Sequence, residues 1–371
     1  MMLFTGCSGS GNNGVNGGNS GSLMPGDNPE PMVTISHKSI TADIGATVPF
    51  SAAVVIASGQ LARTASWSVT GDCGTISTSG LFTAAKTGTC TITVSVAGNR
   101  GQKITDNATI TVEQPGYDII DHPSSVHTYV TGINDNGAIV GSYEGSGERL
   151  YGFVKNGNDY TTVNYPYARH TYVEGINNSG RMVGTYKNTD GIMHGFVKND
   201  ANYEPIDYPN ARETFAWGIN DAGVIVGFFW DKTMGRWRGF VKDGSVYEPI
   251  DHPSAVGTYV VGINATGTIV GYFEDVNGWF HGFTRDGIIY TVADFPADVD
   301  TEIHTINNAG HTAGHYVTAD GVTQGFINDN GQYTIVACPA SDETYVLGIN
   351  ETGRAVGYFI DTNEKAHGFL K

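Results

Sequence analysis

The sequence predicts an all-β protein in which a small β-sandwich precedes a six-bladed β-propeller with four-stranded blades and a ring closed by an N-terminal strand. Three observations support this prediction. The 371 residues include 51 glycines and 11% aromatic residues, but only 15% charged residues. A motif built on Gly-Ile-Asn recurs six times, and its last copy is completed only by residues at the start of the array. This composition favours strands joined by tight turns over helices.

The motif Gly-Ile-Asn-x-x-Gly-x-x-Val-Gly sets the period of the array. Successive copies are 43, 43, 44, 43 and 43 residues apart, with the motif asparagine at Asn134, Asn177, Asn220, Asn264, Asn307 and Asn350. A Thr-Tyr-Val block, a Gly-Phe block and an aromatic or histidine residue before proline keep the same phase; Cys338 replaces the aromatic once and is expected to be an apolar filler. The connecting Asn-x-x-Gly, Asn-Gly and Asp-Gly sequences suit tight turns. Four strands in about 40–50 residues, repeated, are typical of propeller blades.

Two copies of the repeat depart from the others. In the fifth copy, Glu302-Ile303 stands in place of the aromatic-apolar pair, Thr305 in place of glycine and Ala313 in place of valine. In the sixth copy the sequence ends after the third strand. Residues 117–122 match the fourth strand of a repeat, but no first, second or third strand precedes them. We expect these two pieces to pair, because such pairing removes the open edges of the ring.

Residues 32–114 contain six short alternating runs punctuated by Gly, Asn and Asp, the pattern of a small β-sandwich. We expect Trp67 in its core rather than at the surface as a sugar-stacking platform. Cys73 and Cys90 are expected to form a disulfide in an oxidising compartment, which would stabilise the segment by about 3 kcal/mol. The alternative is two buried thiols that never pair.

Both segments resemble known bacterial families. The first resembles bacterial immunoglobulin-like domains, which implies a spacer or adhesion module; the matching blocks are Asp43-Ile44-Gly45-Ala46-Thr47-Val48-Pro49-Phe50, Trp67-Ser68-Val69, Gly74-Thr75-Ile76, Gly80-Leu81-Phe82-Thr83-Ala84 and Gly88-Thr89-Cys90-Thr91-Ile92-Thr93-Val94. Residues 116–371 resemble the HAF-type extracellular repeat family, which implies export and a propeller-like architecture. Besides the repeated motif, the matching blocks are His194-Gly195-Phe196, His281-Gly282-Phe283 and His367-Gly368-Phe369, with glycine in place of the family's alanine. Tyr151, Arg238 and Gln324 replace the histidine elsewhere. That family brings no established chemistry, so no catalytic residue is carried over.

Residues 1–31 are expected to be a lipoprotein-like signal remnant and a linker. The stretch Leu3-Phe4-Thr5-Gly6-Cys7 resembles the lipobox of bacterial lipoproteins, in which the cysteine is lipidated. No basic region precedes it, and the apolar region is shorter than the family's. The Gly, Ser and Asn residues that follow predict a flexible tether. We therefore expect an extracellular protein anchored to the outer membrane through Cys7; the alternative is a plain disordered N-terminus.

Several classes of function are disfavoured by the sequence. A net charge of −17 disfavours nucleic acids and anionic membranes as partners, because phosphate binding needs clustered Lys and Arg. No stretch is long enough for a transmembrane helix. Nucleophile elbows, HExxH, phosphate loops and CxxC are missing. We expect a monomer with no catalytic residues, no cofactor and no metal.

Residues that recur in every blade are expected to serve the blade. The motif asparagines should hydrogen-bond their own turns rather than bind a ligand. His194, His281 and His367 occupy one position on different blades, too far apart for a shared zinc, so we expect them to pack or hydrogen-bond between blades. The recurrent aromatic residues before proline should pack between adjacent blades.

Binding is expected on the face formed by the loops between second and third strands and between blades, where the copies differ. Aromatic residues beside acids there suit a glycan or a surface protein; the candidates are Tyr143, Glu144, Tyr186, Trp230, Asp231, Trp237, Glu274 and Trp279. The leading hypothesis is a non-enzymatic cell-surface binding or adhesion protein. The alternatives are a secreted polysaccharide hydrolase or lyase that uses acids such as Asp231 or Glu274, and a structural envelope component.

Overall fold

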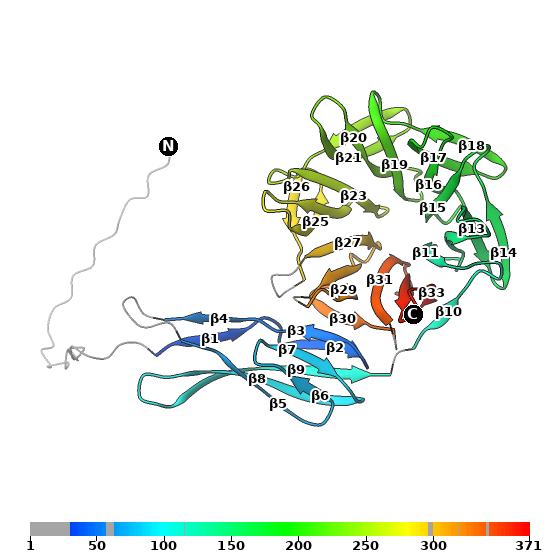
Figure 1. Cartoon of the computed structure of the whole chain (residues 1–371). Coiled ribbons are helices and arrows are strands. Elements are labelled where there is room, and N and C mark those ends of the chain that lie inside the picture. Colours follow the sequence, from blue (N-terminus) through cyan, green and yellow to red (C-terminus); the bar gives the residue numbers. More distant parts are fainter. Residues whose placement is uncertain (1–29, 57–62, 115, 296–299, 319, 339–340) are drawn as a thin grey trace, which may run out of the picture.

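The computed structural model describes residues 30–56, 63–114, 116–295, 300–318, 320–338 and 341–371, and its regular elements are all β-strands (Figure 1). In the described part of the chain no helix has the length and apolar character to cross a membrane. Cys7 and the rest of the expected tether up to residue 29 lie outside the described residues, so the lipid anchor stays a prediction.

The C-terminal part of the chain forms six four-stranded antiparallel units, numbered here in the order of the repeats. Unit 1 consists of β11 (Thr128–Ile133), β12 (Ile139–Glu144), β13 (Leu150–Asn156) and β14 (Asp159–Val163). Unit 2 consists of β15 (His170–Ile176), β16 (Met182–Lys187), β17 (Met193–Asn199) and β18 (Asn202–Ile206). Unit 3 consists of β19 (Ala211–Ile219), β20 (Ile225–Asp231), β21 (Arg236–Asp243) and β22 (Val246–Ile250).

Units 4 to 6 follow the same order. Unit 4 consists of β23 (Gly257–Ile263), β24 (Ile269–Glu274), β25 (Phe280–Asp286) and β26 (Ile289–Val292). Unit 5 consists of β27 (Thr301–Ile306), β28 (Thr312–Val317), β29 (Thr323–Asp329) and β30 (Gln332–Val336). Unit 6 consists of β31 (Ser341–Ile349), β32 (Ala355–Asp361), β33 (Ala366–Leu370) and β10 (Asp118–Ile120). The units stand radially around a centre, which makes this part of the chain a β-propeller (Figure 1).

The ring is closed by strands from the two ends of the array. The short strand β10 pairs antiparallel with β33, with Ile119 opposite Phe369. The pairing expected between residues 117–122 and the third strand of the sixth repeat is therefore confirmed.

Close packing of the first two strands explains the last glycine of the motif. A Cβ atom on Gly227 would lie 1.9 Å from the carbonyl oxygen of Phe215 on the neighbouring strand, and the equivalent glycines of the other units leave 1.8–2.0 Å. No side chain fits at such a distance. The turn glycine Gly137 has a φ of 80°, which a residue with a side chain adopts only with strain.

The N-terminal part forms three small sheets around one apolar core. Its strands are β1 (Met32–Ile35), β2 (Ser39–Asp43), β3 (Thr47–Pro49), β4 (Ala52–Val55), β5 (Ser66–Thr70), β6 (Gly74–Ile76), β7 (Leu81–Ala84), β8 (Gly88–Ala97) and β9 (Lys103–Glu113). Strand β1 pairs with β4, β7 lies between β3 and β6, and β2, β9, β8 and β5 are neighbours in that order. The expected disulfide between Cys73 and Cys90 is formed. Trp67 packs against the core but is only half-buried.

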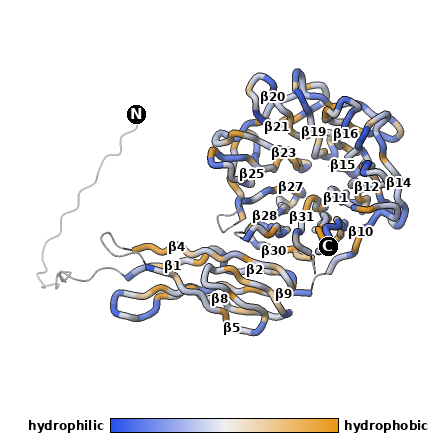
Figure 2. The backbone as a smooth tube through the Cα atoms, in the orientation of Figure 1, coloured by the Kyte–Doolittle hydropathy of each residue, from blue (hydrophilic) through white to orange (hydrophobic). Residues whose placement is uncertain are grey.

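The two parts share a sheet and a core, which the sequence did not reveal. Strand β2 pairs in parallel with β30 of unit 5, with Thr41 opposite Thr334. Apolar stretches along both parts meet where these strands run together (Figure 2). The buried Asp43 carboxylate is paired with Lys371 at 2.7 Å.

Candidate functional site

The six motif asparagines form a closed ring at the centre of the propeller, which we call the Asn ring; its members are Asn134, Asn177, Asn220, Asn264, Asn307 and Asn350. Each Oδ1 accepts a hydrogen bond at 2.9–3.0 Å from the backbone N–H four residues later, which confirms the predicted role in the turn. Each Nδ2 also donates to the backbone carbonyl of the next asparagine at 3.0–3.3 Å, and Asn350 donates back to Asn134. The second bond was not predicted, because its acceptor lies one full period away.

The residues that follow the Asn ring make the mouth of the channel acidic. Glu351 donates its backbone N–H to Asp135, and Asn178 donates its own to Asp221, at 2.8–2.9 Å. These bonds bring carboxylates from units 1, 3 and 6 to one opening. The mouth therefore carries negative charge around the entrance to the central cavity.

Below the Asn ring, a cavity of about 130 Å³ is lined by one further position of each first strand. We call this level the variable ring, because the six units place six different residues there: Thr131, Glu174, Trp217, Val261, His304 and Leu347. Burial raises the pKa of Glu174 to about 8, and no described residue forms a hydrogen bond with its carboxyl group. The six units thus carry the same residue at the Asn ring and six different residues three positions earlier, within the first strands.

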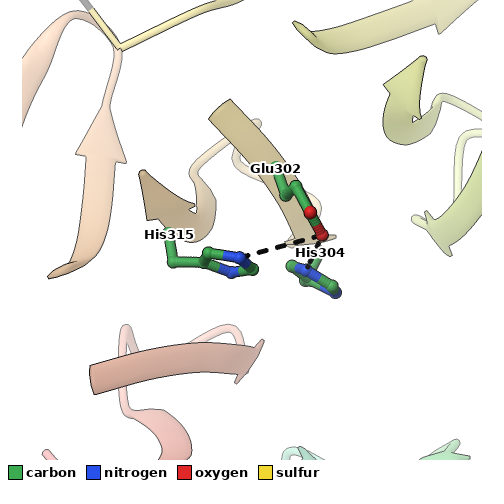
Figure 3. A group of neighbouring side chains, drawn as sticks. All are labelled: Glu302, His304 and His315. Atoms are coloured by element: carbon green, nitrogen blue, oxygen red, sulfur yellow. Dashed lines mark hydrogen bonds and ion pairs between the residues drawn. The ribbon is translucent and has the colours of Figure 1, made fainter. Parts of the chain in front are cut away.

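A second departure from the repeat lies beside the variable ring. At the start of the first strand, four of the other units carry tyrosine and unit 3 carries Phe215, whereas unit 5 carries Glu302. Strand pairing sets Glu302 opposite His315, where the other units have serine, threonine or an aromatic residue. The Glu302 carboxylate accepts a hydrogen bond from His304 Nε2 at 3.2 Å, and His315 Nε2 lies 3.8 Å from the same oxygen (Figure 3).

This cluster of Glu302, His304 and His315 was not anticipated, since we expected no metal-binding group. Its three candidate ligand atoms lie within 4.8 Å of one another. Part of the signal was present in the sequence, because Glu302 replaces an aromatic residue that the other five units carry at the same position. What the sequence did not reveal was the strand register that sets Glu302 beside His315.

The predicted aromatic candidates of units 1 and 2 serve packing. Tyr143 is only 8% exposed and stacks on His122 at 3.6 Å, and Tyr186 stacks on Tyr165 at 3.7 Å. The placement of Tyr143 in a loop of the binding face is therefore wrong, because it lies within β12 and His122, from the loop that precedes unit 1, covers its ring. The same stacking in units 3, 4 and 5 confirms that the recurrent aromatic residues pack between adjacent units.

The candidates of unit 3 are held by their own loop. Trp230 and Trp237 contact each other edge to face at 5.2 Å, and both are half-buried. The Asp231 carboxylate accepts the backbone N–H groups of Thr233 and Met234 and pairs with Arg238 at 2.9 Å. These contacts leave Asp231 a structural role in the loop.

The remaining acidic candidates lie at strand ends. Glu144 closes β12, with its carboxylate 3.9 Å from His127 Nε2, and Glu274 closes β24. Both are half-buried. The structure does not bring either of them to the residues of unit 3.

The three histidines of the third strands each hydrogen-bond an aspartate within their own unit. His194, His281 and His367 contact Asp207, Asp294 and Asp121 at 2.8–2.9 Å. The hydrogen-bonding role is confirmed, but it acts within the blade rather than between blades. Cys338 is buried, as expected for an apolar filler, and burial raises the pKa of its thiol to about 12.

Trp279 lies in a groove between the two parts of the molecule. The side chain of Trp279 is 54% exposed at the second loop of unit 4. The groove has a volume of about 580 Å³ and is also lined by Phe50, Trp67, Ser79, Asp300, Thr318 and Asp320, among others. It thus joins a predicted binding residue to a tryptophan that the sequence assigned to the core. We call it the Trp67–Trp279 groove.

No protein-family model matches the sequence, and no curated protein matches it. Among solved structures, an Aleuria aurantia lectin mutant in complex with Fucα1-6GlcNAc is 10% identical at a TM-score of 0.45, covering 66% of this chain and 93% of the lectin. The β-propeller domain of the Trilobed protease from Pyrococcus furiosus is 10% identical at a TM-score of 0.42, covering 76% of this chain and 91% of that domain. TolB from Acinetobacter baumannii is 12% identical at a TM-score of 0.43, covering 76% of both chains. Likenesses at these values assign neither a ligand nor an activity.

Proposed function

We propose that this protein is an exported, non-enzymatic carbohydrate-binding protein whose ligand occupies the Trp67–Trp279 groove. In this proposal the six units are the blades of a six-bladed propeller of the HAF type. The segment from residue 32 to 114 is a bacterial immunoglobulin-like domain that contributes one side of the site. Lipidation at Cys7 would hold the molecule at the cell surface.

The groove supports this proposal because it combines the two chemistries that sugar recognition uses. Aromatic rings stack on the apolar faces of pyranose rings, and carboxylates and hydroxyls bond the sugar hydroxyl groups. Trp67 and Trp279 supply rings, and Asp320 and Ser79 supply polar groups in the same cavity. The observation that carries the proposal is the exposure of Trp279 inside a groove already lined by a second tryptophan.

Export is supported by the disulfide and by the resemblance to extracellular repeats. Disulfides such as Cys73–Cys90 persist in oxidising compartments. The strand pairing of β2 with β30 supports a fixed geometry for the groove, because backbone hydrogen bonds tie its two sides together.

A hydrolase or lyase is the alternative, and the contacts of Asp231 do not favour it. Asp231, one of the acids proposed for catalysis, accepts backbone hydrogen bonds from its loop, and these bonds together with Arg238 lower its pKa. A general acid needs a raised pKa instead. Turnover of a polysaccharide by the purified protein would nevertheless replace our proposal with this alternative.

The test uses the full chain on a glycan array, followed by calorimetric titration with the best oligosaccharide. Trp279→Ala should weaken binding about tenfold, because an aromatic stacking contact contributes about 1–1.5 kcal/mol. Trp230→Ala is the matched control: it removes a tryptophan from the neighbouring unit 3 and should leave affinity unchanged.

Two outcomes would count against the groove. Binding lost in Trp230→Ala and kept in Trp279→Ala would move the site to the loop of unit 3. Failure of the wild-type protein to bind any glycan would leave a structural envelope role as the better explanation.

A further inference from the structure

The cluster in unit 5 requires an explanation that the propeller itself does not provide. Five units close this level of the ring with an aromatic residue at the start of the first strand. Unit 5 instead places Glu302 among the tyrosine rings of its neighbours. A buried carboxylate costs free energy unless it is paired. One histidine would be enough to pair with the Glu302 carboxylate, yet unit 5 places two histidines beside it.

The distances within the cluster match those between ligands of a single small cation. Two ligand atoms bound at about 2.0–2.1 Å in a tetrahedron are about 3.3 Å apart. Glu302 Oε2 lies 3.2 Å from His304 Nε2 and 3.8 Å from His315 Nε2. Figure 3 shows the three side chains converging from β27 and β28 on one point. The third pair of ligand atoms, on His304 and His315, lies within 4.8 Å, so a bound cation would draw the two rings closer together.

The bonding capacity of the histidines is unfulfilled within the protein. The side chains of His304 and His315 are 6% and 9% exposed. His315 forms no hydrogen bond with any described residue, and the Nδ1 atoms of both rings are buried without a partner there. A buried imidazole without a partner is costly. A ligand at Nε2 of His315 would give that atom a partner that the protein does not supply.

The central cavity gives the cluster an entrance. His304 belongs to both the cluster and the cavity lining. The mouth of the cavity carries the carboxylates of Asp135, Asp221 and Glu351. Such a mouth attracts cations and raises their local concentration.

We infer that Glu302, His304 and His315 form a binding site for a divalent transition-metal cation of the Zn²⁺ class inside the propeller. Two imidazoles and one carboxylate suit Zn²⁺ and similar ions, whereas Ca²⁺ and Mg²⁺ prefer sites built from oxygen alone. Of the three ligands, His304 lines the central cavity, so a cation would reach the cluster from that side.

The experiment uses the full chain without a polyhistidine tag, stripped with a chelator and then titrated with Co²⁺ and Zn²⁺. We expect one Co²⁺ per chain with visible absorption typical of a tetrahedral site, displaced by Zn²⁺. Three variants remove one ligand each: Glu302→Gln, His304→Leu, which installs the residue of unit 6, and His315→Tyr, which installs the residue of units 4 and 6. Each should weaken binding at least about tenfold.

His281→Gln is the matched control, because it removes a histidine that hydrogen-bonds an aspartate outside the cluster. It should leave metal affinity unchanged. Near-ultraviolet circular dichroism of the stripped proteins shows which variants fold, and Glu302→Gln, nearly the same shape as wild type, decides the question if the others do not. The inference is overturned if the wild-type chain binds no stoichiometric metal, or if Glu302→Gln binds it as tightly as wild type.

Discussion

The Asn ring and the variable ring are two levels of one channel, built from the same strands, and they differ in how the repeats use them. At the Asn ring all six units carry the same residue and make the same two hydrogen bonds. At the variable ring they carry six different residues, from Thr131 to Trp217. The contrast teaches that a residue repeated on every blade serves closure of the ring. Residues of the variable ring do not close the propeller, so they can differ between units and take part in binding. His304, one of them, belongs to the cluster of unit 5.

The comparison predicts its largest effect at the Asn ring. Asn220→Ala removes the side-chain partner of the Val224 N–H and one of the two donors to the Asn264 carbonyl oxygen, which still accepts the Gly267 N–H. An unsatisfied buried group costs about 1–3 kcal/mol, so we expect a loss of about 1–3 kcal/mol in the free energy of unfolding. Urea denaturation followed by fluorescence measures it.

Asn136→Ala is the control for this variant, because its side chain makes a comparable hydrogen bond at the exposed turn. It should change stability by less than about 0.5 kcal/mol. Equal losses in the two variants would mean that the Asn ring does not carry the closure of the propeller.

The propeller could be predicted from the sequence because turn residues recur at a constant spacing along the chain. Glycine and asparagine mark each hairpin locally, so the four strands of a unit and the pairing of β10 with β33 followed from their phase. Pairing between β2 and β30 leaves no such mark, because it joins the edges of two segments far apart in the chain. The groove at Trp279 depends on that pairing and could not be predicted either.

Side-chain sites were harder to predict than strands, for reasons of register. The fifth repeat visibly lacked its aromatic residue, but a bulge between Ile303 and Thr305 sets which residues face each other. Without the register, Glu302 and His315 could not be placed together. Tyr143 was misplaced for a related reason, since the sequence did not show that the loop of His122 folds over it.

A smaller effect is expected at Glu174, in the variable ring. Burial raises its pKa from the ordinary value of 4.5 to about 8, so between these pH values the folded state holds a proton that the unfolded state has released. Stability therefore falls as pH rises through this window. Glu174→Gln removes this dependence. Because the side chain borders the cavity and is only half-buried, we expect the variant to gain about 1–2 kcal/mol at pH 8 relative to wild type.

Denaturation of both proteins from pH 4 to pH 9 checks this expectation. The difference in unfolding free energy should grow from pH 4.5 to pH 8 and then level off. A difference that is constant over the whole range would show that Glu174 is ionised in the folded protein, and the variable ring would then tolerate a charge at no cost.

The smallest expected effect is a difference in the free energy of unfolding between variants at two apolar positions on one strand of unit 6. Ile349 adjoins the Asn ring and is isoleucine in all six units, whereas Leu347 belongs to the variable ring. Ile349→Val should cost about 1 kcal/mol, because it deletes a methylene from a repeated packing position. Leu347→Val installs the residue that unit 4 already carries at this position, Val261, and should cost about half as much. Thermal and urea unfolding of the two variants give the comparison. Equal costs would show that the variable ring is packed as strictly as the Asn ring, and its diversity would then reflect six separate packing solutions rather than freedom for binding.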